Sequence, residues 1–293
     1  MKRTFVVLFL SLFLTVGLLA GIARPAYAAQ STITDAEGYA CMGEDKSRKQ
    51  TEQAALADAK RNAAEYAMTY LKSETLVKDS ELQKDLIGAY ANASIKIIQE
   101  IEKKWYKDES LGECFKTRIK AEVIPDEKAM DRVSKSKGVA DDPSAPLTIN
   151  VWTDRKEYKT GEKIKVYVKG NKPFYARVVY KDAGGKMVQL LPNPFRSSNY
   201  FNGGVIYEIP SGEDRFELEV SPPFGNENII VYASSSQVGD IDVKATGGVY
   251  EIKTKAEDIG EKTRGVVIAE KGADKKTASE FSEAGANIKT EER

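Results

Sequence analysis

The stretch "CFKTRIKAEVI", residues 114–124, alternates strictly between two kinds of side chain. One set is small or apolar and the other is charged: Phe115, Thr117, Ile119, Ala121 and Val123 against Lys116, Arg118, Lys120 and Glu122. Successive side chains of a β-strand point to opposite faces of its sheet. The stretch therefore predicts a strand with one buried face, and the residues before it are expected to supply the layer that covers this face.

Two helices are predicted to form that layer. Residues 49–72 place apolar side chains at helical spacing: Leu56, Ala59, Ala63, Ala67 and Tyr70. Most of these are alanines, so this helix can lie close to a sheet. A second helix is predicted over residues 81–104, with an apolar face of Leu86, Tyr90, Ala93, Ile97 and Ile101. With strands at 33–42 and 103–108, residues 29–124 are predicted to form a two-layer α+β sandwich.

The first residues have the pattern of a bacterial secretory signal. Lys2 and Arg3 precede an apolar run over residues 5–23, and an A-x-A pattern ends at Ala28. We expect residues 1–28 to be a signal peptide cleaved after Ala28; the alternative is an uncleaved anchor. A lipid anchor at Cys41 is excluded because "GYA" precedes it, with polar residues between it and the apolar run. The mature chain is expected in the periplasm or outside the cell, with no stable membrane span.

The chain has two cysteines, Cys41 and Cys114. Exported proteins meet an oxidising environment, in which a pair of cysteines usually forms a disulfide. We therefore predict a Cys41–Cys114 disulfide, and two separate buried thiols are the alternative. For a loop of this length the chain-entropy model gives a stabilisation of about 4 kcal/mol.

Composition narrows the possible chemistry. Without residues 1–28 the chain has 41 basic and 44 acidic residues, and this weak negative charge argues against nucleic acid as a partner. The chain has no histidine, so a Cys–His nucleophile pair cannot form within it. No cofactor or metal is expected. The pairs Asp141–Asp142 and Asp240–Asp242 could contribute to a calcium site, but solvated turn carboxylates are the preferred interpretation.

After a polar linker with three prolines, residues 125–146, the pattern changes to short strands separated by turns. A helical turn is expected in the linker near Met130. Regular short strands predict an all-β, immunoglobulin-like sandwich over residues 147–270, its last strand being 265–270. Residues 271–293 are expected to be a polar tail or a covering strand.

Both halves resemble known families. "DRKEYKTGEKIKVYVKGNKPFYARVVYKDAGGKMVQLLPN", "GGVIYEIP" and "PPFGNENIIVYAS" are similar to the bacterial domain of unknown function 4384. "GYACMGED", "QAALADAKRNAAEYA" and "FKTRIKAEVIP" resemble the domain shared by small outer-membrane lipoproteins and the N-terminal domain of the flagellar assembly protein T. The first resemblance implies a β-sandwich module of exported or multidomain bacterial proteins. It implies no established activity.

The best candidate binding surface is the long connection over residues 190–204. It carries aromatic, arginine and amide side chains on a β scaffold, which is typical of binding loops: Asn193, Phe195, Arg196, Asn199, Tyr200 and Phe201. The alternative is that Phe195 and Phe201 pack into the sandwich edge. A glycan platform formed by Trp152, Tyr158, Tyr175 and Tyr180 is a further candidate, although aromatic residues in strands usually pack in the core.

The sequence thus predicts a non-catalytic envelope protein that serves as an adaptor in a cell-surface or secretion assembly, with envelope proteins as partners. A glycan-binding protein is one alternative. A carboxylate-dependent hydrolase of envelope polymers is another, because two acidic side chains can hydrolyse glycosides without histidine.

Overall fold

The computed structural model describes residues 29–74, 80–135, 141–246, 249–264 and 278–293. The predicted signal peptide, residues 1–28, and the predicted strand at 265–270 lie outside the described residues. Within the described residues, no helix has the length and apolar character needed to cross a membrane.

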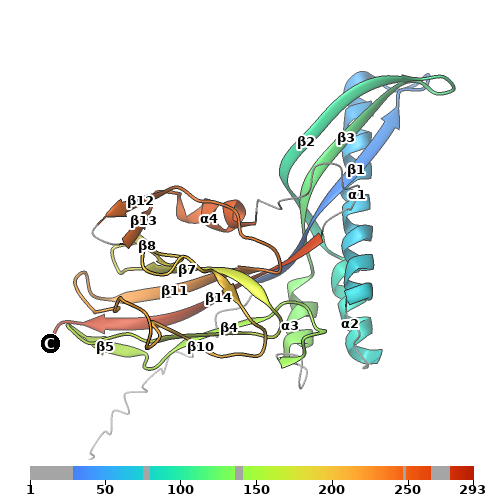
Figure 1. The fold of residues 1–293 in the computed structure, drawn as a ribbon. Helices are drawn as coiled ribbons and strands as arrows, with labels where there is room; N and C mark the ends of the chain where they lie inside the picture. Colours follow the sequence, from blue (N-terminus) through green and yellow to red (C-terminus); the bar gives the residue numbers. More distant parts are fainter. Residues whose placement is uncertain (1–28, 75–79, 136–140, 247–248, 265–277) are drawn as a thin grey trace, which may run out of the picture.

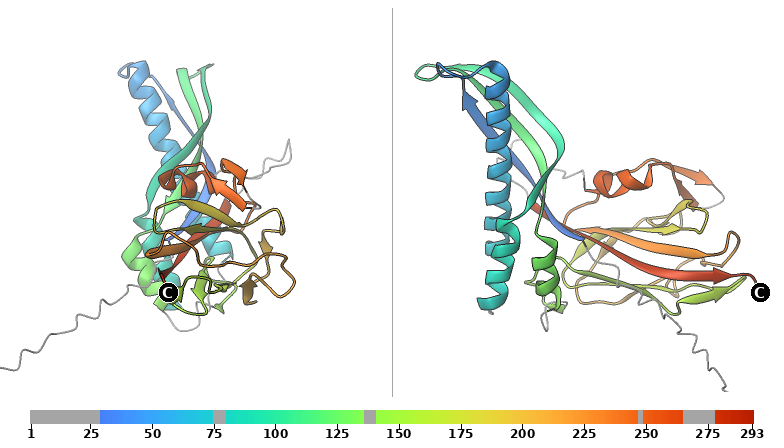
Figure 2. Two further views of the ribbon diagram at one scale, coloured as in Figure 1. Left: turned by 90° about the vertical axis from the view of Figure 1, so that its left-hand side faces the viewer. Right: turned by 180° about the vertical axis from the view of Figure 1, so that it is seen from behind.

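The N-terminal part of the chain combines a curled antiparallel sheet with helices (Figures 1 and 2). The elements are β1 (Ala29–Cys41), α1 (Arg48–Glu74), α2 (Ser80–Ala91), β2 (Ser94–Asp108) and β3 (Gly112–Ile124). The strand order is β1-β3-β2, so β3 lies in the middle. The strand predicted from the alternating stretch is confirmed, and its five small or apolar residues are all buried.

Helix α1 lies unusually close to β1. The buried side chains of the helix include Ala55, Ala59, Ala63 and Ala67, each fully shielded from solvent. The facing strand has a glycine at the contact, because a Cβ built on Gly38 would lie 2.2 Å from both the Ala55 carbonyl oxygen and the Ala59 amide nitrogen. The alanine stripe thus has the effect expected from the sequence, which is to bring the helix backbone onto the sheet.

The second predicted helix is wrong beyond residue 91. Helix α2 ends at Ala91, and Ser94 begins the edge strand β2, which pairs with β3 along its length. Ala93, Ile97 and Ile101 are four residues apart, and this spacing fits both the helical period and the strand period of two. The β-branched residues of "SIKII" favour a strand, and pairing with β3 satisfies the backbone there.

The linker contains a nine-residue helix, α3 (Glu127–Lys135), where a helical turn was expected near Met130. Asp126 caps it, since Asp126 Oδ1 accepts a hydrogen bond of 2.9 Å from the Ala129 amide. Met130 and Val133 are buried in the same core cluster as Leu86 and Tyr90 of α2. The linker is therefore packed against the N-terminal helices.

The C-terminal part is built almost entirely of strands. They are β4 (Ile149–Thr153), β5 (Glu157–Lys159), β6 (Val166–Gly170), β7 (Phe174–Lys181), β8 (Met187–Leu191), β9 (Tyr200–Phe201), β10 (Tyr207–Ile209), β11 (Asn226–Ser234), β12 (Val243–Thr246), β13 (Val249–Ile252) and β14 (Ala278–Glu291), with helix α4 at Ala256–Thr263. Strands β10-β6-β4 form a small separate sheet. The main buried cluster combines residues of this sheet with those of β7, β8 and β11.

The last strand, β14, joins the two parts. It pairs antiparallel with β11 of the C-terminal part and with β1 of the N-terminal part, so one sheet runs in the order β12-β13-β8-β7-β11-β14-β1-β3-β2 (Figure 1). Of the two alternatives for residues 271–293, a polar tail or a covering strand, residues 278–291 form a strand. The strand has few apolar residues, so no alternation marks it in the sequence. Its place is set by backbone pairing on both sides and by partners for its polar side chains.

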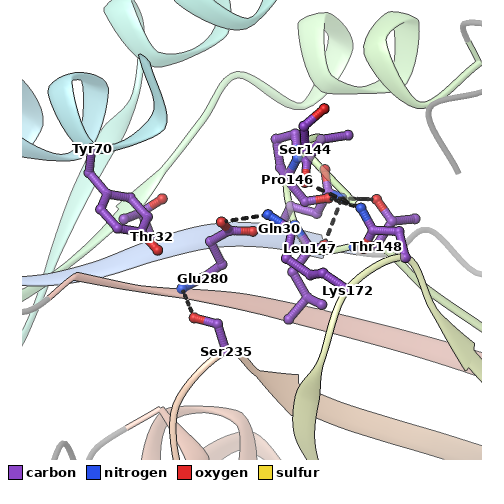
Figure 3. A network of polar contacts seen from close by, with 12 residues as sticks. Gln30, Thr32, Tyr70, Ser144, Pro146, Leu147, Thr148, Lys172, Ser235 and Glu280 are labelled. Atoms are coloured by element: carbon purple, nitrogen blue, oxygen red, sulfur yellow. Dashed lines mark hydrogen bonds and ion pairs between the residues drawn. The ribbon is translucent and has the colours of Figure 1, made fainter. Parts of the chain in front are cut away.

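One such partner set surrounds Glu280, a buried carboxylate of β14 (Figure 3). It accepts hydrogen bonds from the Leu147 amide and from Lys172 Nζ, the latter at 3.0 Å, and its own amide donates to Ser235 Oγ at 2.9 Å. Nearby, Gln30 Nε2 on β1 donates to the Leu147 carbonyl at 2.9 Å. The end of the linker is thereby fixed at the junction of the two parts.

An apolar cluster completes the junction. Ile33 of β1 packs with Tyr232 of β11, Ile259 of α4 and Phe281 of β14, and Ile98 of β2 packs against them. At the far end of β1, Cys41 and Cys114 stand opposite each other in the β1–β3 register and form the predicted disulfide. The two parts share a sheet and a core.

Candidate functional site

The predicted binding loop, residues 190–204, is shaped by Asn193. This side chain is buried: Nδ2 donates to the Leu190 carbonyl at 2.7 Å, and Oδ1 accepts from the amides of Phe195 and Arg196 at 2.8 Å each. Asparagine stabilises turns in this way. Asn193 therefore holds the loop, and its polar atoms are used within the loop.

Arg196 also acts within the fold. Its Nη1 lies 3.2 Å from Asp214 Oδ2, and its guanidinium carbon lies 5.7 Å from the centre of the Phe201 ring. Both partners of the ion pair are well shielded, with side chains 20% and 8% exposed. The arginine ties the loop to the segment around Asp214 and leaves little of its charge for a ligand.

The aromatic residues of the loop separate onto different faces. Phe201 is fully buried and stacks on Phe174 with ring centres 5.0 Å apart, whereas Tyr200 is 45% exposed and meets Tyr175 edge-on at 5.1 Å. Neighbouring residues of a strand face opposite ways, which explains this division. The next residue toward the N-terminus, Asn199, accepts a hydrogen bond at its backbone carbonyl from the Ala176 amide, at 2.8 Å.

Phe195 is the most exposed aromatic side chain of the loop, at 52%, and its ring lies 6.2 Å from that of Phe216. The structure therefore does not gather the six predicted residues into one surface. Two of them, Phe195 and Tyr200, are exposed aromatic side chains, and each rests on a different neighbour.

The four aromatic residues considered for a glycan platform do not form a common surface either. Trp152 stacks on Tyr167 in the three-stranded sheet, with ring centres 5.6 Å apart. Tyr158 is buried and its hydroxyl donates to Asp154 at 2.7 Å; burial, with this carboxylate, raises the pKa of Tyr158 to about 12. Tyr175 and Tyr180 are five residues apart on β7 and so face opposite sides.

A groove that the sequence did not predict lies beside the segment that precedes β11. Its volume is about 500 Å³, within the range of ligand sites. The apolar lining consists of Ile164, Tyr180, Val188, Leu190, Leu218, Ile229, Pro222, Pro223 and the exposed Val249; the polar lining is Asp182, Lys186, Glu217, Glu219 and Ser221. These residues are spread over almost ninety positions, from 164 to 249, so no local pattern marks the groove. The signal that could have found it is the pair of family motifs around Leu190 and Pro223.

A buried polar set lies next to this groove. Tyr180, one of its lining residues, donates from its hydroxyl to Glu227 Oε2 at 2.5 Å, and Thr290 Oγ1 of β14 donates to Glu227 Oε1 at 2.9 Å. Burial, together with the Glu227 carboxylate, raises the pKa of Tyr180 above its ordinary value. The Gly225 amide also donates to Thr290 Oγ1, at 3.1 Å. The turn over residues 223–227 thus attaches β14 to the wall of the groove.

Three of the four carboxylates considered for calcium, those of Asp141, Asp142 and Asp242, have other partners. Asp141 pairs with Lys169 at 2.5 Å, and Asp142 Oδ1 accepts from the Ser144 hydroxyl at 2.6 Å. Asp242 pairs with Lys262 at 2.7 Å, which holds the pKa of that carboxyl below its usual value. In the described ranges, no group of three or more His, Cys, Asp or Glu residues is arranged to hold a metal ion.

Comparison with protein families agrees with one resemblance seen in the sequence. Residues 157–237 match DUF4384, a domain of unknown function, and this range contains most of the groove and the whole candidate loop. Comparison with the curated proteins found no match, and comparison with the solved structures found none either.

Proposed function

We propose that this protein is an exported, non-catalytic component of the cell envelope that acts as an adaptor in a surface or secretion assembly. In this proposal the N-terminal part is an α+β unit of the kind shared by small outer-membrane lipoproteins and the flagellar assembly protein T. The C-terminal part is an immunoglobulin-like sandwich, and envelope proteins are the partners. Export rests on the signal pattern of residues 1–28.

The observation that carries the proposal is the position of β14. This strand pairs with β11 on one side and β1 on the other, so both parts belong to one sheet. Backbone pairing of this kind holds the two parts at a fixed distance and orientation. A protein that must present two contact surfaces in a fixed relation to each other benefits from such a connection.

Both parts of the chain carry exposed apolar side chains. In the N-terminal part these are Tyr39 on β1, 63% exposed, and Leu111 in the turn between β2 and β3, 62% exposed. In the C-terminal part Phe195 and Ile206 are 52% and 57% exposed. Exposed aromatic and aliphatic residues of this kind are common where proteins bind partners.

In-cell photo-crosslinking tests the adaptor proposal. A photoreactive phenylalanine analogue is placed at Leu111 or at Phe195 in the native host, with the exposed Glu65 of α1 as the control position. We expect each apolar position to capture a specific envelope protein and Glu65 to capture none. Identical weak labelling from all three positions would refute the adaptor role.

Export has its own test. The N-terminal mass of the protein purified from its host should correspond to a chain that begins at Ala29, and the protein should be released with the periplasmic fraction or the medium. A chain that still begins at Met1, or that stays in the cytoplasm, would contradict this part of the proposal.

Glycan binding is a second candidate, supported by Trp152. This ring stacks on Tyr167 and is 38% exposed at the edge of the three-stranded sheet. Sugar rings stack on exposed aromatic faces of this kind. Titration of Trp152 fluorescence with soluble peptidoglycan fragments would show a saturable change if the site binds glycan, and Trp152→Ala would abolish it.

A further inference from the structure

The groove beside residues 216–223 combines an apolar floor with an acidic border. Ile164, Leu190 and Ile229 are buried at its base. Asp182, Glu217 and Glu219 are the acidic lining residues, and Lys186 is the single basic one. A ligand that fits this lining therefore has an apolar part and a positive charge.

The charged side chains that line the groove differ in whether they already have an ion-pair partner. Glu217 lies 2.6 Å from Lys163, and Lys186 lies 3.8 Å from Glu251 outside the groove. Glu219 makes no ion pair with any residue that the structure describes. The basic side chain of the lining is thus engaged elsewhere, whereas one carboxylate is available.

The segment that carries these carboxylates is also an open strand edge. It runs antiparallel to residues 161–164: the Ile164 amide donates to the Leu218 carbonyl at 2.8 Å, and the Val220 amide donates to the Glu162 carbonyl at 2.9 Å. In an antiparallel pair, alternate residues turn their backbone groups the other way. The amides and carbonyls of Glu217 and Glu219 accordingly form no backbone hydrogen bond with the described part of the chain.

The geometry points to this groove as a docking site for an extended peptide in which a bulky apolar residue alternates with lysine or arginine. The peptide backbone pairs with Glu217 and Glu219, as in strand addition to a sheet edge. Its apolar side chain enters the floor over Leu190 and Ile229, and its basic side chains meet Glu219 and Asp182. A peptide is favoured over a small ligand because the backbone groups of Glu217 and Glu219 are unpaired in the described part of the chain.

This inference rests on the proposed binding role and names the chemistry of the partner. The probe is a short fluorescent peptide of alternating lysine and leucine, titrated into the purified protein and followed by fluorescence anisotropy. Three matched peptides accompany it: glutamate replaces lysine in one, serine replaces leucine in another, and alternate backbone amides are N-methylated in the third. We expect the lysine–leucine peptide to bind at least ~10-fold more tightly than each of the three.

Variants of the protein locate the site. Glu217→Lys/Glu219→Lys reverses two exposed charges and should weaken binding of the lysine–leucine peptide by ~10-fold or more and make it less sensitive to salt. Glu109→Lys, in the turn between β2 and β3, is the matched control and should leave affinity unchanged. Thermal unfolding confirms that each variant is folded. Equal affinity for the lysine and glutamate peptides, or wild-type affinity in the double variant, would overturn the proposal.

The results also separate this inference from the adaptor proposal. If crosslinking captures an envelope protein and the Glu217→Lys/Glu219→Lys variant captures it equally well, the adaptor role stands and the groove is refuted as its docking site. If the peptide binds as expected but no envelope protein is captured from Leu111 or Phe195, the groove stands as a peptide site and the adaptor proposal is refuted.

Discussion

Arg264 and Glu122 form an ion pair across the junction of the two parts. Arg264 Nε, just after α4, lies 2.7 Å from Glu122 Oε1 on β3, and the two side chains are only 14% and 2% exposed. Ser31 Oγ of β1 donates to the same carboxylate oxygen at 2.6 Å, and the guanidinium carbon lies 4.3 Å from the centre of the Phe281 ring. The pair therefore joins elements that are far apart in the sequence.

Replacing the arginine should be costly. Arg264→Met leaves Glu122 buried without its cation, and removal of one partner of a buried pair typically costs about 3–5 kcal/mol. Urea unfolding at neutral pH measures the loss.

The matched control is Arg61→Met, which removes an exposed cation paired with Asp58 and should cost less than about 1 kcal/mol. The double variant Arg264→Met/Glu122→Met should recover part of the stability, because no unpaired charge remains. Equal losses for Arg264→Met and Arg61→Met would show that the junction pair is dispensable.

Two glycines give opposite predictions for the same substitution. Gly38→Ala places a Cβ 2.2 Å from backbone atoms of α1, and the helix must move away from β1, so we expect a loss of about 2 kcal/mol or more. Gly88→Ala, inside α2, meets open space and should stabilise the protein by about 0.5–1 kcal/mol. Thermal and urea unfolding compare the variants; a neutral Gly38→Ala would mean that the close contact does not exist.

The disulfide should contribute most of its effect through the unfolded chain. Cys41 and Cys114 are 73 residues apart, for which loop closure gives about 4 kcal/mol. The variant Cys41→Ala/Cys114→Ala should unfold at correspondingly lower urea concentration and keep its far-UV circular dichroism. Treatment of the wild type with a reductant should reproduce the shift, and should leave the double variant unaffected. A double variant as stable as the wild type would contradict the prediction.

Asp154 should make the free energy of unfolding depend on pH in the acidic range. Burial alone would raise its pKa, but hydrogen bonds from the Tyr158 hydroxyl at 2.7 Å and the Lys165 amide at 2.9 Å outweigh burial and hold the pKa of Asp154 below its usual value. A depressed folded-state pKa contributes stability at all pH values above the unfolded pKa, near 3.9, and loses it as the pH falls through the folded value.

The measurement is the urea midpoint from pH 7 downward for the wild type and Asp154→Asn. The wild type should be the more stable at pH 7, and the difference should shrink below about pH 4 as the carboxylate protonates. A difference that stays constant down to the lowest pH would show that Asp154 acts through packing rather than through its charge.

Local sequence patterns predicted the helices and strands that have one apolar face and one charged face. The alternation over 114–124 identified β3, and the alanine-rich stripe over 49–72 identified α1 and its close approach to the sheet. The family motifs in 157–237 were also visible in the sequence. The sequence did not predict the end of α2 because the spacing of residues 93, 97 and 101 fits both the helical period and the strand period. Strand β2, which these residues enter, is stabilised by pairing with β3, more than ten residues further along the chain.

The candidate functional site also has a part that the sequence predicts and a part that only the tertiary structure shows. Residues 190–204 were identified as a loop rich in aromatic and polar groups, but the sequence could not show that Asn193 and Arg196 serve the loop itself or that Phe201 is buried. No local pattern in the sequence predicts the groove, because Ile164, Leu190 and Val249 come together only after the strands pair.

The sequence by itself determined the local structure wherever one face of an element is apolar and the other is charged, and it determined the disulfide by offering each cysteine a single partner. Only the tertiary structure decided that residues 278–291 form the strand between the two parts. Strand β14 is stabilised by backbone hydrogen bonds to β11 and β1 and by partners for Glu280 and Thr290. Backbone groups are the same in every sequence, so they leave no local pattern. The side-chain partners are distant in sequence, Lys172 being 108 residues from Glu280 and Glu227 63 residues from Thr290. No local pattern of side chains could therefore reveal the pairing.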